Sequence, residues 1–324
     1  MWMTLSGIFL GWSLGANHTG NVFGTGVATG TVKYRTAIIL TAIFVFLGSY
    51  LEGPKCMKTV GALSTLTPIE AFYCALAAGL MMSILTFLAF PGSASQAIIG
   101  AVLGAGVLSH TADFTKLYKI VTCWAFTPVF AIFASYSLYH ILGYALERTR
   151  ISMTRRNLIY SIGTLLTGCY GAYCLGSNNV ANVTGVYVGS GLLDARTAAL
   201  IGGISIAAGV LTYSRKVMMT IGKGIVPLDP FSALVSVLAS ALCLHVFTQI
   251  GVPVSSSQAI VGSVVGIGLA GDVQTVSLKM LGRIALGWVL APTTAGILAY
   301  LFIRFDLLAL LKSWHFFFLQ FHGM

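Results

Sequence analysis

Charged side chains are scarce in this sequence. Asp, Glu, Lys and Arg together make up 8% of the 324 residues, whereas hydrophobic residues make up 57% and the mean hydropathy is +0.90. A soluble domain carries about 25% charged residues to keep its surface hydrated. The shortage therefore excludes a sizeable extramembrane domain, and it predicts an all-α integral membrane protein.

Acidic residues are rarer still, with 8 Asp and Glu against 18 Lys and Arg and a formal net charge of +10. The basic residues are scattered between apolar segments rather than gathered on one face. In a membrane protein such an excess serves topology and contact with anionic headgroups. Membrane lipid is therefore an expected partner, and nucleic acid is not.

Motifs of metal sites and enzymes are missing as well. The six cysteines have no CxxC or other metal-ligand spacing, and five of them lie in apolar segments, where Cys packs as a small hydrophobic residue. The sequence has no GxSxG, HExxH, Walker or GxGxxG motif in a context that supports catalysis. We expect no enzyme, no catalytic residue, no metal ligand and no cofactor.

Charge-free runs mark the membrane segments. Residues 1–32 hold the first predicted span, while the runs 71–112 and 230–271 are each too long for one helix. Pro91 and Pro253 split these two runs, so each predicts a full span followed by a short half-helix or re-entrant segment. Each half then has five crossings, which gives about 10 spans in all.

The two halves of the chain repeat one another. With an offset of 161 residues, Gly15–Gly24 matches Gly176–Gly185, and with an offset of 162, Pro91–Gln96 matches Pro253–Gln258. Chance matching of apolar sequence produces scattered Ala, Leu and Gly identities, but not Asn, Gln and Pro in register. An odd number of crossings per half predicts that the two repeats are inverted.

The repeat also predicts the domain organisation. Residues 1–146 form the first transmembrane repeat and residues 158–304 the second. A basic linker at 147–157 joins them, and its arginines place it in the cytoplasm. Residues 305–324 form a C-terminal tail that is amphipathic or a short membrane segment.

Polar residues interrupt the apolar segments at matching places in both halves. The runs Gly15–Gly24 and Gly176–Gly185 combine glycines with carboxamides, which predicts a broken helix in each half. Paired interruptions of this kind indicate the substrate site of a transporter. Two other classes remain open: a passive channel built like an aquaporin, which would carry NPA-type motifs, and a non-transporting membrane subunit, which would need no such polar residues.

The four motifs resemble those of a known family. GANxxxN occurs at Gly15–Asn21 and, with serine in place of alanine, at Gly176–Asn182, and PxSxSQAIxG occurs at Pro91–Gly100 and Pro253–Gly262. In this order they are similar to the inorganic phosphate transporter (PiT) family, whose sulfate-transporting relatives share the same frame. The resemblance covers Leu5–Ile303. It implies a PiT-like fold in the prokaryotic plasma (inner) membrane, with a homodimer as the assembly to expect.

The resemblance further implies an ion-coupled symporter that binds an inorganic oxyanion near the membrane midplane, between the broken helices and the Pro-Ser motifs. Physical chemistry agrees, because hydroxyls, carboxamides and N–H groups at helix N-termini suit a tetrahedral oxyanion. Ordinary N-capping by Ser and Asn is the alternative. The candidate substrate ligands are Asn17, Asn21, Asn178, Asn182, Ser93, Ser95, Gln96, Ser255, Ser256, Ser257 and Gln258, with Thr25, Asn179 and Thr184 as secondary motif positions.

The sequence departs from the family pattern at its acidic positions. His18 and Asn179 stand where the family typically carries Asp, and Gln96 and Gln258 stand where its second motif typically ends in His. A carboxylate holds Na⁺ and accepts a hydrogen bond from the P–OH group of phosphate, whereas sulfate has no proton to donate near neutral pH. The substitutions favour sulfate over phosphate. Na⁺-coupled phosphate transport remains open, because carbonyls and hydroxyls also bind Na⁺.

His18 is the one titratable side chain inside a motif. Because histidine titrates near neutral pH, His18 is the candidate group for taking up a coupling proton. The alternative is a neutral histidine that donates to the anion or to a backbone carbonyl. The expected coupling ion is therefore H⁺ or Na⁺.

Overall fold

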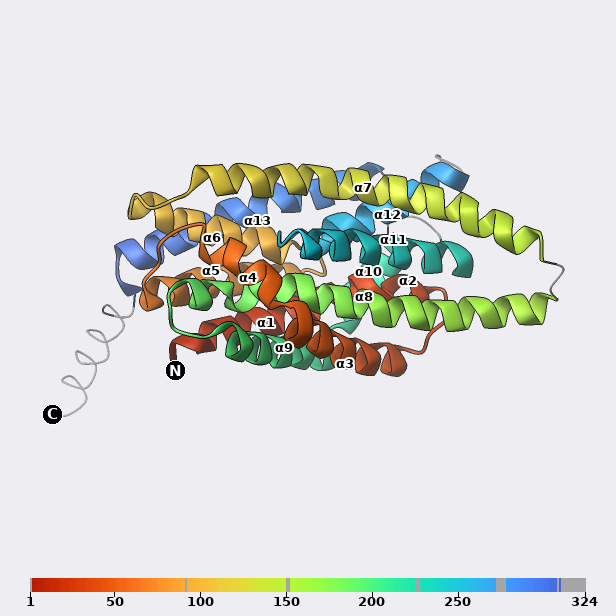
Figure 1. Ribbon diagram of the computed structural model, residues 1–324, viewed down its shortest axis with the longest axis horizontal. Helices are drawn as coiled ribbons and strands as arrows, with labels where there is room; N and C mark the ends of the chain where they lie inside the picture. Colours follow the sequence, from red (N-terminus) through yellow and green to blue (C-terminus); the bar gives the residue numbers. More distant parts are fainter. Residues whose placement is uncertain are drawn as a thin grey trace.

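The computed structural model describes residues 2–90, 92–149, 152–224, 228–271, 278–307 and 309. Every regular element in this part of the chain is a helix, and most helices run along the long axis of the molecule (Figure 1). The all-α prediction is therefore confirmed for the described residues. The predicted C-terminal tail lies almost entirely outside them.

The helices of the second half follow the order of those in the first. The first half contains η1 (Trp2–Thr4), α1 (Leu5–His18), α2 (Gly20–Ala28), α3 (Tyr34–Glu52), α4 (Pro54–Gly61), α5 (Pro68–Phe87), α6 (Ala94–Leu108) and α7 (Phe114–Glu147). The second contains α8 (Met153–Gly189), α9 (Ala195–Thr212), α10 (Arg215–Gly224), α11 (Pro230–Gln249), α12 (Ser256–Gly271) and α13 (Leu278–Arg304). The helix α8 takes the place of α1 and α2, and α9 to α13 correspond to α3 to α7.

Within the described part of the chain, seven helices are long and apolar enough to cross a membrane, namely α3, α5, α7, α8, α9, α11 and α13. The helices α6 and α12 have 15 and 16 residues, as expected for half-helices. The predicted first span is divided between α1 and α2, neither of which reaches spanning length by itself. The predicted count of about 10 spans, which included these short segments as crossings, stays a prediction.

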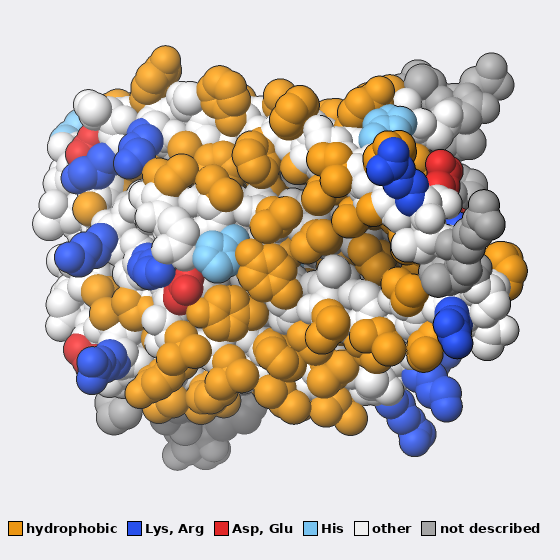
Figure 2. Space-filling view, turned by 45° about the vertical axis from the view of Figure 1, so that its right-hand side comes forward, with side chains coloured by type: hydrophobic (Ala, Val, Ile, Leu, Met, Phe, Trp, Pro, Cys, Tyr) orange, Lys and Arg blue, Asp and Glu red, His pale blue; other side chains and the backbone are white. Residues whose placement is uncertain are grey.

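The surface has the character of a membrane protein. Figure 2 shows hydrophobic side chains across the middle of the molecule, with Lys and Arg gathered toward its two ends. Large apolar side chains are exposed along α7, where Phe126 is 61% and Phe133 is 71% accessible. A contiguous apolar belt of this kind would aggregate in water, but it matches the hydrocarbon core of a bilayer.

Acidic side chains help to cap the N-terminal ends of several helices outside the motifs. Thr67 and Glu70 form a capping box at the start of α5, and Asp113, Asp194 and Asp229 accept backbone N–H bonds at the starts of α7, α9 and α11. Hydrogen bonds from the backbone amide and the side chain of Lys116 lower the pKa of Asp113. These acids therefore have a structural explanation.

The predicted helix break in the second copy is wrong. The helix α8 continues without interruption through Gly176–Gly185. In the first copy Thr19 alone separates α1 from α2, and its φ of −56° and ψ of −32° are helical. Polar side chains in both copies bond back to their own helix, as in the 3.1 Å bond from Asn179 Nδ2 to the Leu175 carbonyl. The carboxamides are thus accommodated without unwinding.

The glycines of these runs serve close helix packing instead. Gly15 of α1 lies against Ile206 of α9, and Gly176 of α8 lies against Val45 of α3. A Cβ atom at either glycine would overlap the carbonyl oxygen of its neighbour. The two contacts correspond under the 161-residue offset. Glycine is therefore required here because two backbones touch.

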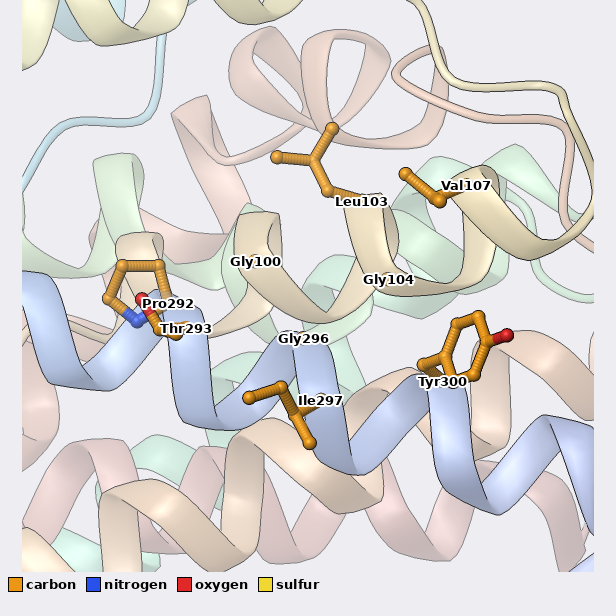
Figure 3. A pocket seen from close by; sticks show the side chains of 9 residues that line it. All are labelled: Gly100, Leu103, Gly104, Val107, Pro292, Thr293, Gly296, Ile297 and Tyr300. Carbon is orange, nitrogen blue, oxygen red and sulfur yellow. The ribbon is translucent and has the colours of Figure 1, made fainter.

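Each half-helix packs on the last long helix of the other half. Gly100 and Gly104 of α6 contact α13, and Gly262 and Gly266 of α12 contact α7. Figure 3 shows Gly104 facing Gly296, and both glycines line an apolar groove of about 460 Å³. These crossed contacts join each half-helix to the opposite half of the chain.

Candidate functional site

The four motifs meet at one place in the fold. Asn21 Nδ2 lies 3.0 Å from Ser256 Oγ, and Asn182 Nδ2 lies 2.8 Å from Ser95 Oγ. Ser95 in turn donates to the Val254 carbonyl at 2.8 Å, which joins the first turn of α6 to the connection that precedes α12. The motif residues of both halves are therefore in direct contact.

All candidate site residues are buried. The least buried is Gln258, with 6% of its surface accessible, and Gln96 and Asn21 have 4% each. The remaining members are accessible to 1% or less: Asn17, His18, Thr25, Ser93, Ser95, Asn178, Asn179, Asn182, Thr184, Ser255, Ser256 and Ser257. The candidate site is therefore shielded from solvent in this structure.

The serines of the two Pro-Ser motifs divide into two groups. Ser93 Oγ and Ser255 Oγ each accept the N–H group three residues later, at 3.3 Å, so both act as N-caps. The capping alternative therefore holds for these two residues. Ser95 and Ser256 instead contact asparagines of the other half, and Ser257 Oγ lies 2.9 Å from Ser255 Oγ.

Several motif residues carry buried polar atoms without a partner in the described structure. Buried polar groups in native proteins are nearly always hydrogen-bonded, so each exception calls for a missing partner. The atoms in question are His18 Nε2, Asn21 Oδ1, Thr25 Oγ1, Gln96 Oε1, Asn182 Oδ1 and Gln258 Oε1. They come from both halves and from all four motifs.

The secondary positions differ in this respect. Thr184 Oγ1 donates to the carbonyls of Val180 and Ala198 at 3.2 and 3.0 Å, so its hydroxyl proton is already used. Asn179 Oδ1 accepts from Asn182 Nδ2 at 3.1 Å. Thr25 alone among the three has an unpartnered atom. The structure therefore brings Asn179 into the polar network and leaves Thr184 as a helix contact.

His18 is oriented by its own helix. Its Nδ1 atom lies 3.1 Å from the Leu14 carbonyl, an acceptor, so Nδ1 carries the proton in the neutral ring. The unpartnered Nε2 then has a free lone pair, which makes it the atom that would take up a second proton. Among the described residues no group of three His, Cys, Asp or Glu side chains is placed to hold a metal ion.

The sequence reasoning missed Thr86 and Thr248. Thr86 Oγ1 accepts a hydrogen bond from Asn17 Nδ2 at 3.1 Å, and Thr248 Oγ1 accepts one from Asn178 Nδ2 at 3.0 Å. The two threonines are related by the same 162-residue offset as the Pro-Ser motifs. Extending the repeat comparison into the preceding helix would have found them.

A comparison with protein-family models decides the identity. The model of the phosphate transporter family matches residues 14–299, which is most of the chain. The chain belongs to this family. The resemblance read from its motifs is thereby confirmed, and the protein is a transmembrane protein of a transporter family.

Individual relatives carry two different substrate names. A putative phosphate permease of Methanocaldococcus jannaschii is 31% identical over 90% of this chain and 92% of its own length. A sulfate permease of Bacillus subtilis is 29% identical over 94% of this chain and 87% of its own length. A solved structure described as the sodium-dependent phosphate transporter has the same fold, with a TM-score of 0.81 at 20% identity, covering 92% of this chain and 96% of that one.

Proposed function

We propose that this chain is a secondary active transporter, an ion-coupled symporter of an inorganic tetrahedral oxyanion, with sulfate ahead of phosphate. The observation that carries the proposal is the set of unpartnered buried atoms on His18, Asn21, Gln96, Asn182 and Gln258. They converge from both halves, as a site at a repeat interface requires. A non-transporting subunit has no use for such a costly arrangement.

The anion would be bound by the N-terminal ends of α6 and α12. The first N–H groups of a helix lack partners within the helix, and the helix dipole adds positive potential there. Ser95 and Ser256 lie in these first turns, and Ser257 follows. Neutral donors of this kind bind an anion selectively without an ion pair, which leaves the anion free to be released.

The coupling cation would be bound by oxygen atoms. The unpartnered atoms of Asn21, Gln96, Asn182 and Gln258 are assigned as amide oxygens. Oxygen ligands suit a hard cation such as Na⁺, whereas His18 Nε2 suits a proton. Either ion would offset part of the anion charge inside the closed site, and this links the two binding events.

Sulfate is placed first because none of the four motifs carries a carboxylate. A carboxylate facing fully ionised sulfate would repel it, whereas phosphate can donate a proton to such a group. Sodium-coupled phosphate transport is the second candidate. The amide oxygens favour it, and so does the likeness to the sodium-dependent phosphate transporter.

We further propose two inverted repeats, at residues 1–146 and 158–304, on either side of a cytoplasmic linker. In support, α1 begins at the end of the molecule that carries the N label, whereas its counterpart α8 begins at the opposite end (Figure 1). The helix α8 starts at Met153, so part of the predicted linker is helical. The prokaryotic plasma (inner) membrane and a homodimer complete the proposal.

Uptake into proteoliposomes tests the function. The purified chain would be supplied with labelled sulfate or labelled phosphate while Na⁺ and pH gradients are imposed separately, with protein-free liposomes as the control. Concentrative sulfate uptake supports the first candidate, and sodium-driven phosphate uptake supports the second. Accumulation of neither anion would refute both.

A further inference from the structure

The two asparagines of the first GANxxxN motif have different partners. Asn17 Nδ2 donates to Thr86 Oγ1 at 3.1 Å and to the Phe90 carbonyl at 2.9 Å, and Asn17 Oδ1 accepts from the Gly92 N–H group at 3.0 Å. All three partners lie at the end of α5 or in the connection to α6. Asn17 is therefore bonded to the helical hairpin α5–α6 of its own half.

The second motif repeats this geometry with different neighbours. Asn178 Nδ2 donates to Thr248 Oγ1 at 3.0 Å and to the Val252 carbonyl at 3.2 Å, and Asn178 Oδ1 accepts from the Val254 N–H group at 2.9 Å. Each partner lies 162 residues after its counterpart in the first half. The arrangement thus occurs twice in one chain, on sequences that differ at most other positions.

The orientation of both amide groups is fixed by their partners. The Thr86 hydroxyl donates to the Met82 carbonyl at 2.7 Å, so it can only accept from Asn17. The Thr248 hydroxyl donates in the same way to the Leu244 carbonyl at 2.8 Å. Both N–H bonds of each amide are therefore committed. An anion therefore finds no free N–H group on either side chain.

The other asparagines of the motifs, Asn21 and Asn182, reach the opposite half. Asn21 contacts Ser256 in the first turn of the second half-helix, and Asn182 contacts Ser95 in the first turn of the first. Each keeps a buried Oδ1 without a partner in the described structure. Asn21 and Asn182 therefore each keep one amide oxygen that is available to a ligand.

We infer that Asn17 and Asn178 are positioning residues, which hold the two hairpin ends and thereby the first turns of α6 and α12. Asn21 and Asn182 form the contacts that join the halves across the site. The inference deepens the proposed function and rests on it. Since α5 packs on α1 and α11 packs on α8, each motif helix also contacts the hairpin of its own half. The cross-half contacts are those that change when the site opens.

A double-mutant cycle tests this assignment in transport. We call the three hydrogen bonds between Asn17 and the α5–α6 hairpin the clamp. Asn17→Ala removes all three bonds, and Thr86→Val removes one of their acceptors without changing any motif residue. We expect Asn17→Ala to raise the apparent KM for sulfate and phosphate by the same factor, roughly tenfold, with a smaller shift for Thr86→Val. The double variant should be no worse than Asn17→Ala. Thr86→Ser, which keeps the hydroxyl, should restore the wild-type value.

Asn21→Ala provides the contrast. Asn21 Nδ2 makes one hydrogen bond in the described structure, to Ser256 Oγ, so its second N–H group can donate to the anion. Loss of a group that touches the anion should change the ratio of sulfate to phosphate uptake. The ratio should stay constant in Asn17→Ala and Thr86→Val. Additive effects of these two changes, or a changed ratio in either of them, would overturn the inference. Asn178 and Thr248 offer the same cycle in the second half.

Hydrogen exchange separates this inference from the proposed function. In detergent, peptides from the α5–α6 connection should exchange faster in Asn17→Ala and Thr86→Val than in the wild type, but not in Asn21→Ala. This readout does not depend on transport of any substrate. Unchanged exchange in Thr86→Val would refute the clamp even if uptake is found. Faster exchange without any uptake would retain the clamp and refute the proposed function.

Discussion

The Lys55 ammonium group donates a hydrogen bond to Gln249 Oε1 at 2.8 Å, which joins α4 of the first half to the end of α11 in the second. Gln249 Nε2 donates to Glu52 Oε2 at 2.9 Å, and Lys55 lies 3.4 Å from the same oxygen. At the corresponding place in the other half, Lys216 donates to the Phe87 carbonyl at 2.8 Å. A lysine from each half therefore reaches the end of a hairpin helix in the other.

Gln249→Leu should loosen the first of these contacts. Glu52 and Lys55 remain paired, so the expected loss is about 0.5–1.5 kcal/mol in unfolding free energy, in line with one or two partly exposed hydrogen bonds. Thermal unfolding in detergent would measure it. Ile250→Ala is the matched control, because Ile250 is adjacent and 53% exposed. Equal effects of the two changes would contradict this role of Gln249.

Gly176→Ala should destabilise the fold strongly. The new Cβ would meet the Val45 carbonyl oxygen, and neither backbone can retreat without shifting α3 from α8. Overpacking of this kind costs typically 1–3 kcal/mol. Gly287→Ala is the control, since no atom lies within 4 Å of a Cβ built at that helical position. A lower melting temperature in detergent is expected for Gly176→Ala alone; tolerance of both changes would rule out the close contact between α8 and α3.

Comparison of sequence and structure shows where local patterns suffice. The half-helix predicted after Pro91 is present as α6, from Ala94 to Leu108. It could be predicted because its signals, a proline and a capping serine before the helix, are local in the sequence. The continuity of α8 could not be predicted in this way. Gly176 fits a broken helix or a close packing contact equally well, and only the distant Val45 decides between them.

The different hydrogen-bonding roles of Asn17 and Asn21 also could not be predicted from the sequence. Both are asparagines in one motif, and both repeat in the second half. Their roles differ because Asn17 faces the end of its own hairpin while Asn21 faces Ser256 of the other half. That choice depends on how the halves pack, which the motif itself does not encode.

His18→Gln tests the coupling proton. The His18 Nε2 atom is unpartnered in the described structure and could take up a proton. Glutamine keeps a polar side chain of similar length, but its amide does not take up a proton near neutral pH. If H⁺ is the coupling ion, uptake driven by a pH gradient should be lost, whereas exchange of internal for external anion should persist. Undiminished pH-driven uptake in the variant would exclude His18 as the proton site, and uptake that follows only the Na⁺ gradient would assign coupling to Na⁺.

Asn179→Asp tests the substrate argument directly, because it returns a carboxylate to a position where the family typically has one. Asn179 Oδ1 accepts a hydrogen bond from Asn182 Nδ2 at 3.1 Å, and an aspartate oxygen can accept the same bond. The added negative charge repels sulfate but can accept a proton from phosphate. The ratio of phosphate to sulfate uptake should therefore rise, by roughly tenfold if one charge-assisted hydrogen bond is gained.

Thr184→Ser is the control for this change. The Thr184 hydroxyl is already bonded to its own helix, so the substitution should leave the ratio unchanged. An unaltered ratio in Asn179→Asp would mean that the missing carboxylates do not set the preference, and the case for sulfate would fall.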